Sequence, residues 1–206
     1  MSRHLGPKCK LCRRSRVKLF LKGERCHTAK CAIEKRNVPP GPQGNMQKKM
    51  GEYAIRLREK QKMRFFYGVS ERQMQGYFER ASRAKGVTGY NLVSLFERRL
   101  DNILHRSGLA ASRQDARQMV VHGHFRINAR KVSIPSQLLK VGDEVAVSMN
   151  GSEILQARFN AMKEKTMPAW LQFDATAQVI KFLYLPERSE IDVPVEDQLI
   201  VEYYSR

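Results

Sequence analysis

Four cysteines near the N-terminus have types and spacing that suit metal binding. Cys9, Cys12, Cys26 and Cys31 are the only cysteines of the chain; two residues separate the first pair, thirteen the two pairs and four the last pair. Each pair can chelate from one turn, so the spacing predicts one tetrahedral zinc ion bound by four thiolates. An iron–sulfur cluster takes the same ligands and stays open, and two disulfides would require an oxidising compartment.

The charge of the chain predicts a polyanionic partner. Its 206 residues have a formal net charge of +18, a pI near 10.1 and a mean hydropathy of −0.52. Residues 1–36 contain 12 basic and 2 acidic side chains, whereas residues 160–206 contain 5 basic and 8 acidic ones. Such concentrated positive charge favours nucleic acid against the N-terminal half.

Neither secretion nor membrane insertion is expected. The first residues lack the apolar run of a signal peptide, and no window approaches 18 apolar residues. The chain should therefore be cytoplasmic, with reduced cysteines.

The segments that follow the cysteines predict a small helical domain. Residues 37–44 contain three prolines and two glycines and read as a linker. Helices are expected over 46–66, from a capping box at Ser70 and Gln73 to Gly86, and from Thr88 to Gly108. At the C-terminus, residues 195–204 allow a helix or a strand.

A second basic segment, residues 97–150, predicts two short helices against a small sheet. Ser112 should cap the second helix, and strands are expected over 132–134 and 144–148. Basic side chains cluster here into a phosphate-binding face, comprising Arg113, Arg117, His122, His124, Arg126, Arg130, Lys131 and Lys140. In the intervening hairpin, Asn128-Ala129 leaves the turn type open, because a type I′ turn with alanine would cost about 1 kcal/mol.

These motifs resemble the RNA-binding module named after ribosomal protein S-four. The matching features are Arg99-Leu-Asp, Gly108-Leu, Ser112-Arg, Ala116-Arg, His122-Gly-His, the Asn128 hairpin and Gly142-Asp. The cysteine cluster, the Pro-Pro-Gly arm, the helix from Lys48 and the ending Leu199–Arg206 extend the resemblance to nearly the whole chain. The chain is similar to the bacterial family of small-subunit ribosomal protein S-four, in the zinc-binding form of the family that contains these cysteines.

The resemblance implies a scaffold that binds 16S ribosomal RNA at a multi-helix junction in the 5′ domain, nucleates assembly of the body and contributes to translational accuracy. It also implies contacts with ribosomal protein S-five and messenger RNA at the entry channel, without membrane or small-molecule substrate. The expected RNA-binding residues are Arg3, Lys8, Arg13, Arg14, Lys22, Lys48, Lys49, Arg56, Arg72, Arg113, Arg117, His122, His124, Arg130 and Lys131. An acidic protein interface is expected at Glu187, Glu190, Asp192, Glu196 and Asp197.

The expected fold class is α+β, in three parts. Residues 1–44 form a metal-clipped basic arm and linker. Residues 45–96 with 188–206 form a helical rRNA-binding domain. Between them, residues 97–187 form an inserted module of two helices packed on an antiparallel sheet.

Two alternative functions stay open. Arg99-Leu-Asp101 resembles the signature around the catalytic aspartate of pseudouridine synthases, but a helical setting where Asp101 can pair with an arginine, and the lack of a catalytic-sized domain, argue against an enzyme. A free RNA-binding translational regulator could use the same module. The helical domain and metal arm would then be superfluous, which favours a ribosomal part.

Overall fold

The computed structural model describes residues 4–42, 49–148, 155, 157–159, 162 and 167–205. Its contacts divide the chain into two compact units, residues 1–93 with 192–206 and residues 94–191. Helix α5 (Thr88–Glu97) carries the chain from the first unit into the second. None of the helices in the described part of the chain is long and apolar enough to cross a bilayer.

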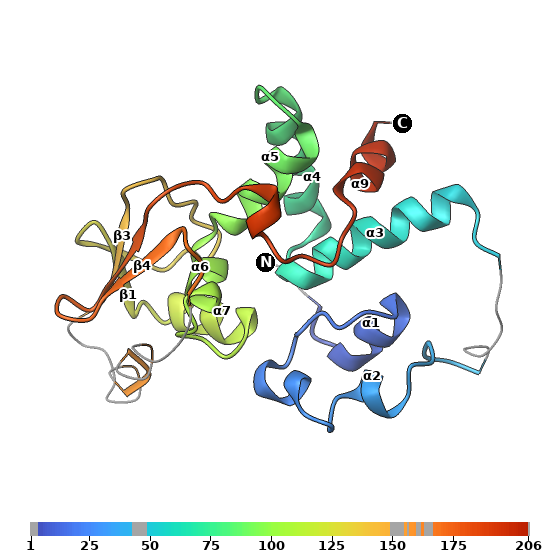
Figure 1. Cartoon of the computed structure of the whole chain (residues 1–206), viewed down its shortest axis with the longest axis horizontal. Helices are drawn as coiled ribbons and strands as arrows, with labels where there is room; N and C mark the ends of the chain where they lie inside the picture. The colour runs from blue at the N-terminus through green and yellow to red at the C-terminus, as the bar shows by residue number, and fades with distance from the viewer. Residues whose placement is uncertain are drawn as a thin grey trace. The chain divides into compact units, whose positions relative to one another are not determined.

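The first unit is helical in the part that the structure describes. It comprises α1 (Lys8–Ser15), the 3-10 helix η1 (Gly23–His27), α2 (Ala32–Lys35), α3 (Glu52–Tyr67), α4 (Glu71–Arg83) and the C-terminal α9 (Asp197–Tyr204). Helices α3 and α9, far apart in sequence, lie side by side (Figure 1). The C-terminal segment, for which the sequence allowed a helix or a strand, is therefore a helix.

The ends of α3 and α4 follow from glycine and capping residues in the local sequence. Helix α3 begins at Glu52 and not at 46, because Gly51 is extended (φ −69°, ψ 161°); residues 43–48 lie outside the described part. It ends at Gly68, whose φ of 64° suits glycine. Ser70 caps α4 as predicted, its hydroxyl accepting from Gln73 N at 3.3 Å, and α4 ends at Arg83, before the expected Gly86.

Apolar and aromatic side chains of these helices form the core of the first unit. Met63, Met74 and Ala81 are fully buried, as is Ile200 on α9. Of the aromatic residues on these helices, Phe66, Tyr67 and Tyr77 are buried, whereas Tyr53 is 61% exposed.

The predicted helix from Thr88 to Gly108 is wrong in one respect, because the structure breaks it in two. Helix α5 ends at Glu97, and α6 (Leu100–Arg106) begins after Arg99, which is extended (φ −69°, ψ 139°). Arg99 instead forms a bridge with Leu138, and Arg98 O accepts from Leu139 N at 2.9 Å. Tertiary pairing thus outweighs the helical pattern. Helix α7 (Arg113–Val121) follows, capped by Ser112 as expected.

Among the described residues of the second unit, five strands form one antiparallel sheet in the order β2-β1-β3-β5-β4. They are β1 (Phe125–Ile127), β2 (Arg130–Val132), β3 (Glu144–Val147), β4 (Leu171–Asp174) and β5 (Val179–Phe182). Strand β2 lies two residues earlier than expected, because it pairs with β1 directly across a two-residue turn. A 3-10 helix, η3 (Arg188–Glu190), follows the sheet.

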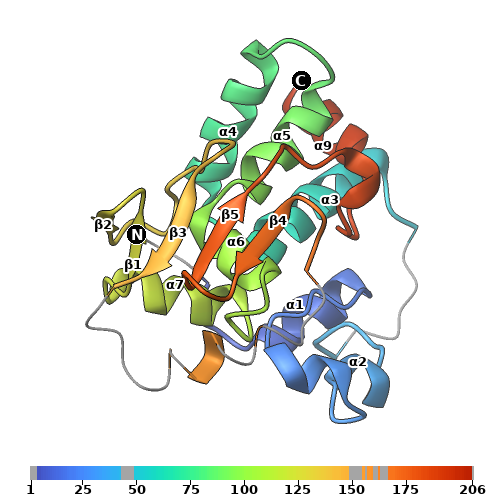
Figure 2. The same ribbon diagram turned by 60° about the vertical axis from the view of Figure 1, so that its left-hand side comes forward.

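Helices α6 and α7 lie behind the sheet and share its core (Figure 2). Ile103 and Leu104 from α6 and Val120 from α7 belong to the same buried cluster as Phe125 and Phe182 of the strands. Trp170, which immediately precedes β4, is also in this cluster. The structure confirms the broad prediction of helices combined with an antiparallel sheet.

Candidate nucleic-acid interface

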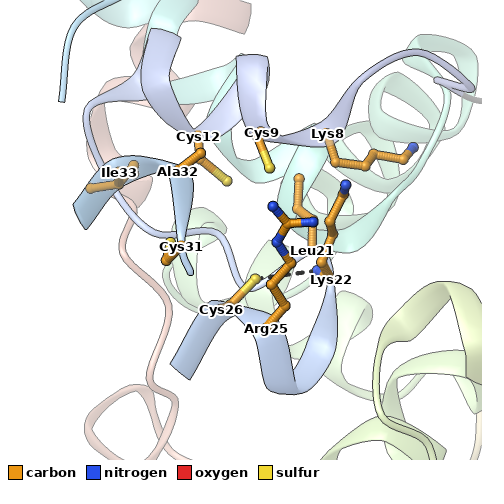
Figure 3. A pocket seen from close by; sticks show the side chains of 10 residues that line it. All are labelled: Lys8, Cys9, Cys12, Leu21, Lys22, Arg25, Cys26, Cys31, Ala32 and Ile33. Carbon is orange, nitrogen blue, oxygen red and sulfur yellow. Dashed lines mark hydrogen bonds between the residues drawn. The ribbon is translucent and has the colours of Figure 1, made fainter. Parts of the chain in front are cut away.

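The four cysteines line one pocket in the first unit. Cys9 and Cys12 lie one turn apart on α1, Cys26 lies on η1, and Cys31 immediately precedes α2. All four border a pocket of about 20 Å³, together with Lys8, Leu21 and other arm residues. Figure 3 shows the sulfurs of Cys9, Cys12 and Cys26 turned towards the enclosed space. That volume suits a single ion.

The surroundings of the thiols fit a metal in donor chemistry. None of the four is in a disulfide. Lys22 N–H donates to Cys26 Sγ at 3.4 Å, a bond that would stabilise a thiolate. Burial raises the pKa of Cys12 despite a backbone hydrogen bond from Leu19, so that thiol stays protonated unless a cation replaces its proton.

The distances between possible ligand side chains bear on whether the thiols could hold a metal. Within the described part of the chain, no three His, Cys, Asp or Glu side chains are close enough together to hold an ion. The structure thus brings the four cysteines to one pocket, and a closed tetrahedral site stays a prediction.

The basic residues expected to bind RNA in the first unit have different surroundings. Arg14, Lys49 and Arg72 are exposed. Lys8 donates to His4 O, and Arg13 Nε donates to Val38 O at 2.7 Å, which ties α1 to the linker. Lys22 is exposed and borders the cysteine pocket. Arg3 and Lys48 lie outside the described residues.

Arg56 differs from the rest of that set, because its side chain is only 15% exposed. Its Nε lies 2.7 Å from Glu202 Oε2, and its Nη2 lies 3.2 Å from Glu52 Oε2. These hydrogen bonds, the first of which links α3 to α9, raise the pKa of Arg56. The guanidinium therefore has a role in joining the two helices.

Arg58 is a candidate that the sequence did not single out. Burial lowers the pKa of its guanidinium, and the nearby charges of Arg14 and Arg16 lower it further. Arg16 itself ends α1 in the left-handed region, with a φ of 56°. Three like charges held near one another would be stabilised by a phosphate. Only tertiary packing of α1 on α3 brings them together, so no local signal could have revealed them.

In the second unit, a glycine brings Lys131 to the two histidines. Gly123 has a φ of 75°, and a Cβ there would lie 2.8 Å from Lys131 Cε. Its neighbours His122 and His124 have ring centroids 5.9 Å apart. Exposed Arg130 is on the same strand as Lys131. The end of α7 and the β1–β2 hairpin therefore present a basic surface of the kind that binds phosphates.

Arg113 and Arg117 of α7 are half-buried and already hydrogen-bonded or ion-paired. Arg113 Nε donates to Asn102 Oδ1 at 2.7 Å, and Arg117 Nη1 lies 3.7 Å from Asp101 Oδ2. Asp101 pairs at 2.6 Å with the buried Arg99, which confirms the expected arginine partner. Sequence analysis missed Glu97 and Asn102, although polar residues within an otherwise apolar helical pattern are a usable signal.

The five acidic residues of the expected protein interface lie on both units. In the second unit, Glu187 and Glu190 form a reciprocal capping box around η3, and Glu190 also accepts from Tyr184 at 2.7 Å. In the first unit, Asp192 and Glu196 are exposed, while Asp197 packs against Gly89. Two of the five thus belong to the second unit and three to the first, and a shared interface stays a prediction.

Comparison with known proteins covers the whole chain. Residues 3–97 match the family described as "Ribosomal protein S4/S9 N-terminal domain", and residues 98–145 match the "S4 domain". The chain is 55% identical over 207 residues to "Small ribosomal subunit protein uS4A" of Symbiobacterium thermophilum. It is 48% identical to "Small ribosomal subunit protein uS4" of Thermodesulfovibrio yellowstonii over 208 residues and of Thermus thermophilus over 209. Each alignment covers 100% of both chains. The chain therefore belongs to the uS4 family of small-subunit ribosomal proteins.

Proposed function

We propose that the chain aligns ribosomal RNA helices within the small ribosomal subunit. As a member of the uS4 family, it is a structural constituent of that subunit and binds rRNA. The observation that carries the proposed mechanism is that basic surfaces occur on both compact units. A protein with two such surfaces can neutralise phosphates of different RNA segments, release their counterions and restrain the segments relative to each other.

The proposed RNA target is a multi-helix junction in the 5′ domain of 16S rRNA. Binding there would nucleate assembly of the body and contribute to translational accuracy, as the resemblance to the S-four family implies. The exposed Arg14, Lys49 and Arg72 in one unit and Arg130 and Lys131 in the other support phosphate contacts that do not depend on sequence.

The proposed cofactor is one zinc ion bound by Cys9, Cys12, Cys26 and Cys31. The shared pocket and the backbone N–H donated to Cys26 Sγ support it. When bound, zinc would cross-link three short elements that have little core of their own. The basic side chains of the arm would then meet RNA already ordered.

The proposed protein partner is ribosomal protein S-five, with messenger RNA at the entry channel as a further contact. Exposed Glu187, Glu190, Asp192 and Glu196 support docking of a basic protein, because acidic groups repel RNA and attract cationic side chains. Charge reversal at these positions should weaken protein contacts and spare binding to isolated rRNA.

We propose no catalytic role. Asp101, the residue that resembles a synthase aspartate, is only 5% exposed and is bonded to Arg99 through both oxygens, at 2.9 and 2.6 Å. A carboxylate so occupied is poorly placed to attack a base. Asp101→Ala should therefore leave the uridine isomerisation of bulk rRNA unchanged.

Footprinting on naked 16S rRNA, combined with elemental analysis of the purified protein, tests the RNA target and the metal separately. Protection should concentrate in the 5′ domain, and one zinc per chain should be found. Co-sedimentation distinguishes the alternative of a free regulator. A ribosomal constituent stays with the small subunit through a high-salt wash, whereas a regulator would remain near the top of the gradient.

A further inference from the structure

Helix α6 begins on a network of charged and polar side chains buried beneath α7. Asn102, only 1% exposed, lies at its centre. Its Nδ2 donates to Glu97 Oε2 at 2.6 Å and to Glu97 O at 3.3 Å, while its Oδ1 accepts from Arg113 Nε at 2.7 Å. Glu97 Oε2 and the Glu97 backbone O can only accept hydrogen bonds, and the Arg113 guanidinium can only donate them. These partners therefore allow only one orientation of the Asn102 amide.

Glu97 is itself fixed, because its carboxylate is fully buried and held by a fork of two hydrogen bonds. Arg106 Nε and Nη2 donate to its two oxygens at 3.0 and 2.9 Å. Bidentate pairs of this kind restrict both partners in direction as well as distance. The hydrogen bonds from Arg106 through Glu97 and Asn102 thus restrain the side-chain conformation of Arg113.

A carboxylate in the place of Asn102 would lie 2.6 Å from that of Glu97, with no proton to share at neutral pH. The amide instead links a buried acid to an arginine, because it donates at one end and accepts at the other. It does so without adding negative charge next to the RNA-binding surface.

Arg113 is half-buried at the N-terminus of α7. It is the first residue of α7, where the helix dipole repels a cation. Hydrogen bonds and ion pairs connect Arg99 and Arg117 to Asp101 and Arg106 to Glu97. Asn102 connects Glu97 to the guanidinium of Arg113. This set carries excess positive charge, which suits a phosphate.

We propose that Asn102 is a positioning residue for RNA binding: it holds Arg113 by Nε so that the guanidinium is already aimed when a backbone phosphate arrives. The inference rests on the rRNA-binding function proposed above. Asn102 itself touches no RNA. It acts by reducing the number of rotamers that Arg113 must give up on binding.

A double-mutant cycle on the full-length protein tests this role. Dissociation constants are measured for a 16S rRNA transcript with wild type, Asn102→Ala, Arg113→Ala and the double variant. Arg113→Ala should weaken binding about tenfold, as expected for one charge-assisted phosphate contact, and Asn102→Ala should weaken it several-fold. The double variant should bind no more weakly than Arg113→Ala, because Asn102 has nothing left to position.

Losses that multiply in the double variant would overturn the proposal, since Asn102 would then act without Arg113. Wild-type affinity in Asn102→Ala would overturn it as well. Gln114→Ala is the matched control, since Gln114 is exposed on the same turn, and it should bind as wild type does. If wild type itself fails to bind, the proposed function fails and this inference falls with it, whereas wild-type binding with unchanged affinity in Asn102→Ala overturns this inference alone.

A second variant serves if Asn102→Ala does not fold. Arg113→Lys keeps the charge but lacks the planar fork that meets Asn102 and a phosphate at once. It should bind nearly as weakly as Arg113→Ala. Wild-type affinity in Arg113→Lys would show that charge alone suffices and that positioning by Asn102 is irrelevant.

Discussion

The turn of the β1–β2 hairpin contains a residue, Ala129, whose replacement by glycine should stabilise the protein. Asn128 and Ala129 have φ values of 47° and 67°, so both central residues occupy the left-handed region that a type I′ turn requires. Asparagine tolerates this region, and Asn128 is also held by Glu144 N donating to its Oδ1 at 3.0 Å and by its own Nδ2 donating to Asp143 at 2.8 Å. Ala129 has no such compensation.

Replacing Ala129 with glycine should stabilise the second unit by about 0.5 to 1 kcal/mol. The left-handed region costs a residue with a Cβ about 1 to 2 kcal/mol, and glycine gives back about 0.4 to 1 kcal/mol through the greater freedom of the unfolded chain. For a unit of this size, the difference corresponds to a rise in Tm of about 2 to 6 °C.

Trp170 provides a local readout, because it is the only tryptophan of the chain and is buried in the core of the second unit. Its fluorescence during thermal unfolding should show the later transition in Ala129→Gly. Ala177→Gly is the control: Ala177 is exposed in the turn between β4 and β5 and lacks a positive φ, so glycine there should lower Tm. The next residue, Gln178, has a φ of 53°, so Gln178→Gly should raise Tm. A Tm that falls in Ala129→Gly would refute the reasoning from φ.

Three further predictions concern the cofactor, acid stability and the packing of α9. Cys26→Ser should abolish zinc binding and expose the amides of the arm to hydrogen exchange, while the Trp170 transition stays in place; loss of that transition would make the cysteines central to the whole fold. Burial lowers the pKa of His105 from 6.5 to about 4, so the unfolded chain takes up a proton in that range before the folded one does. Stability should therefore be complete above pH 6.5 and fall towards pH 4 by up to about 3 kcal/mol, and His105→Gln should flatten this limb of a pH series of denaturant titrations. Tyr204→Phe removes the 2.9 Å hydrogen bond to Glu71 and should cost about 1 kcal/mol in urea unfolding; an unchanged midpoint would show that this bond contributes nothing net.

Local signals predicted the capped helices well. Ser70 and Ser112 each accept a backbone N–H from three residues ahead, as their positions before apolar runs indicated. The break at Arg98-Arg99 could not be predicted in the same way. Its cause is pairing with Leu138 and Leu139, some forty residues later, and the periodicity of residues 88–108 contains no trace of it.

The basic residues divide along the same line. Charge counts predicted a polyanion and its preference for the N-terminal half, but not which side chains hold the fold together. Arg56 has a carboxylate on α9 as its partner, and Arg13 has the linker backbone. Sequence alone could not separate these from exposed Arg14 and Arg72, since partner and burial depend on segments distant in the chain.

By itself, the sequence determined the strongly cationic composition, a cysteine spacing that predicts one metal, and family motifs along nearly the whole length of the chain. These follow from covalent order and local geometry. Tertiary structure decided which charges are buried, that Asn102 connects Glu97 to Arg113, and that Arg14, Arg16 and Arg58 lie near one another. Such contacts depend on how helices pack, and packing is set by the whole buried core and not by any one segment.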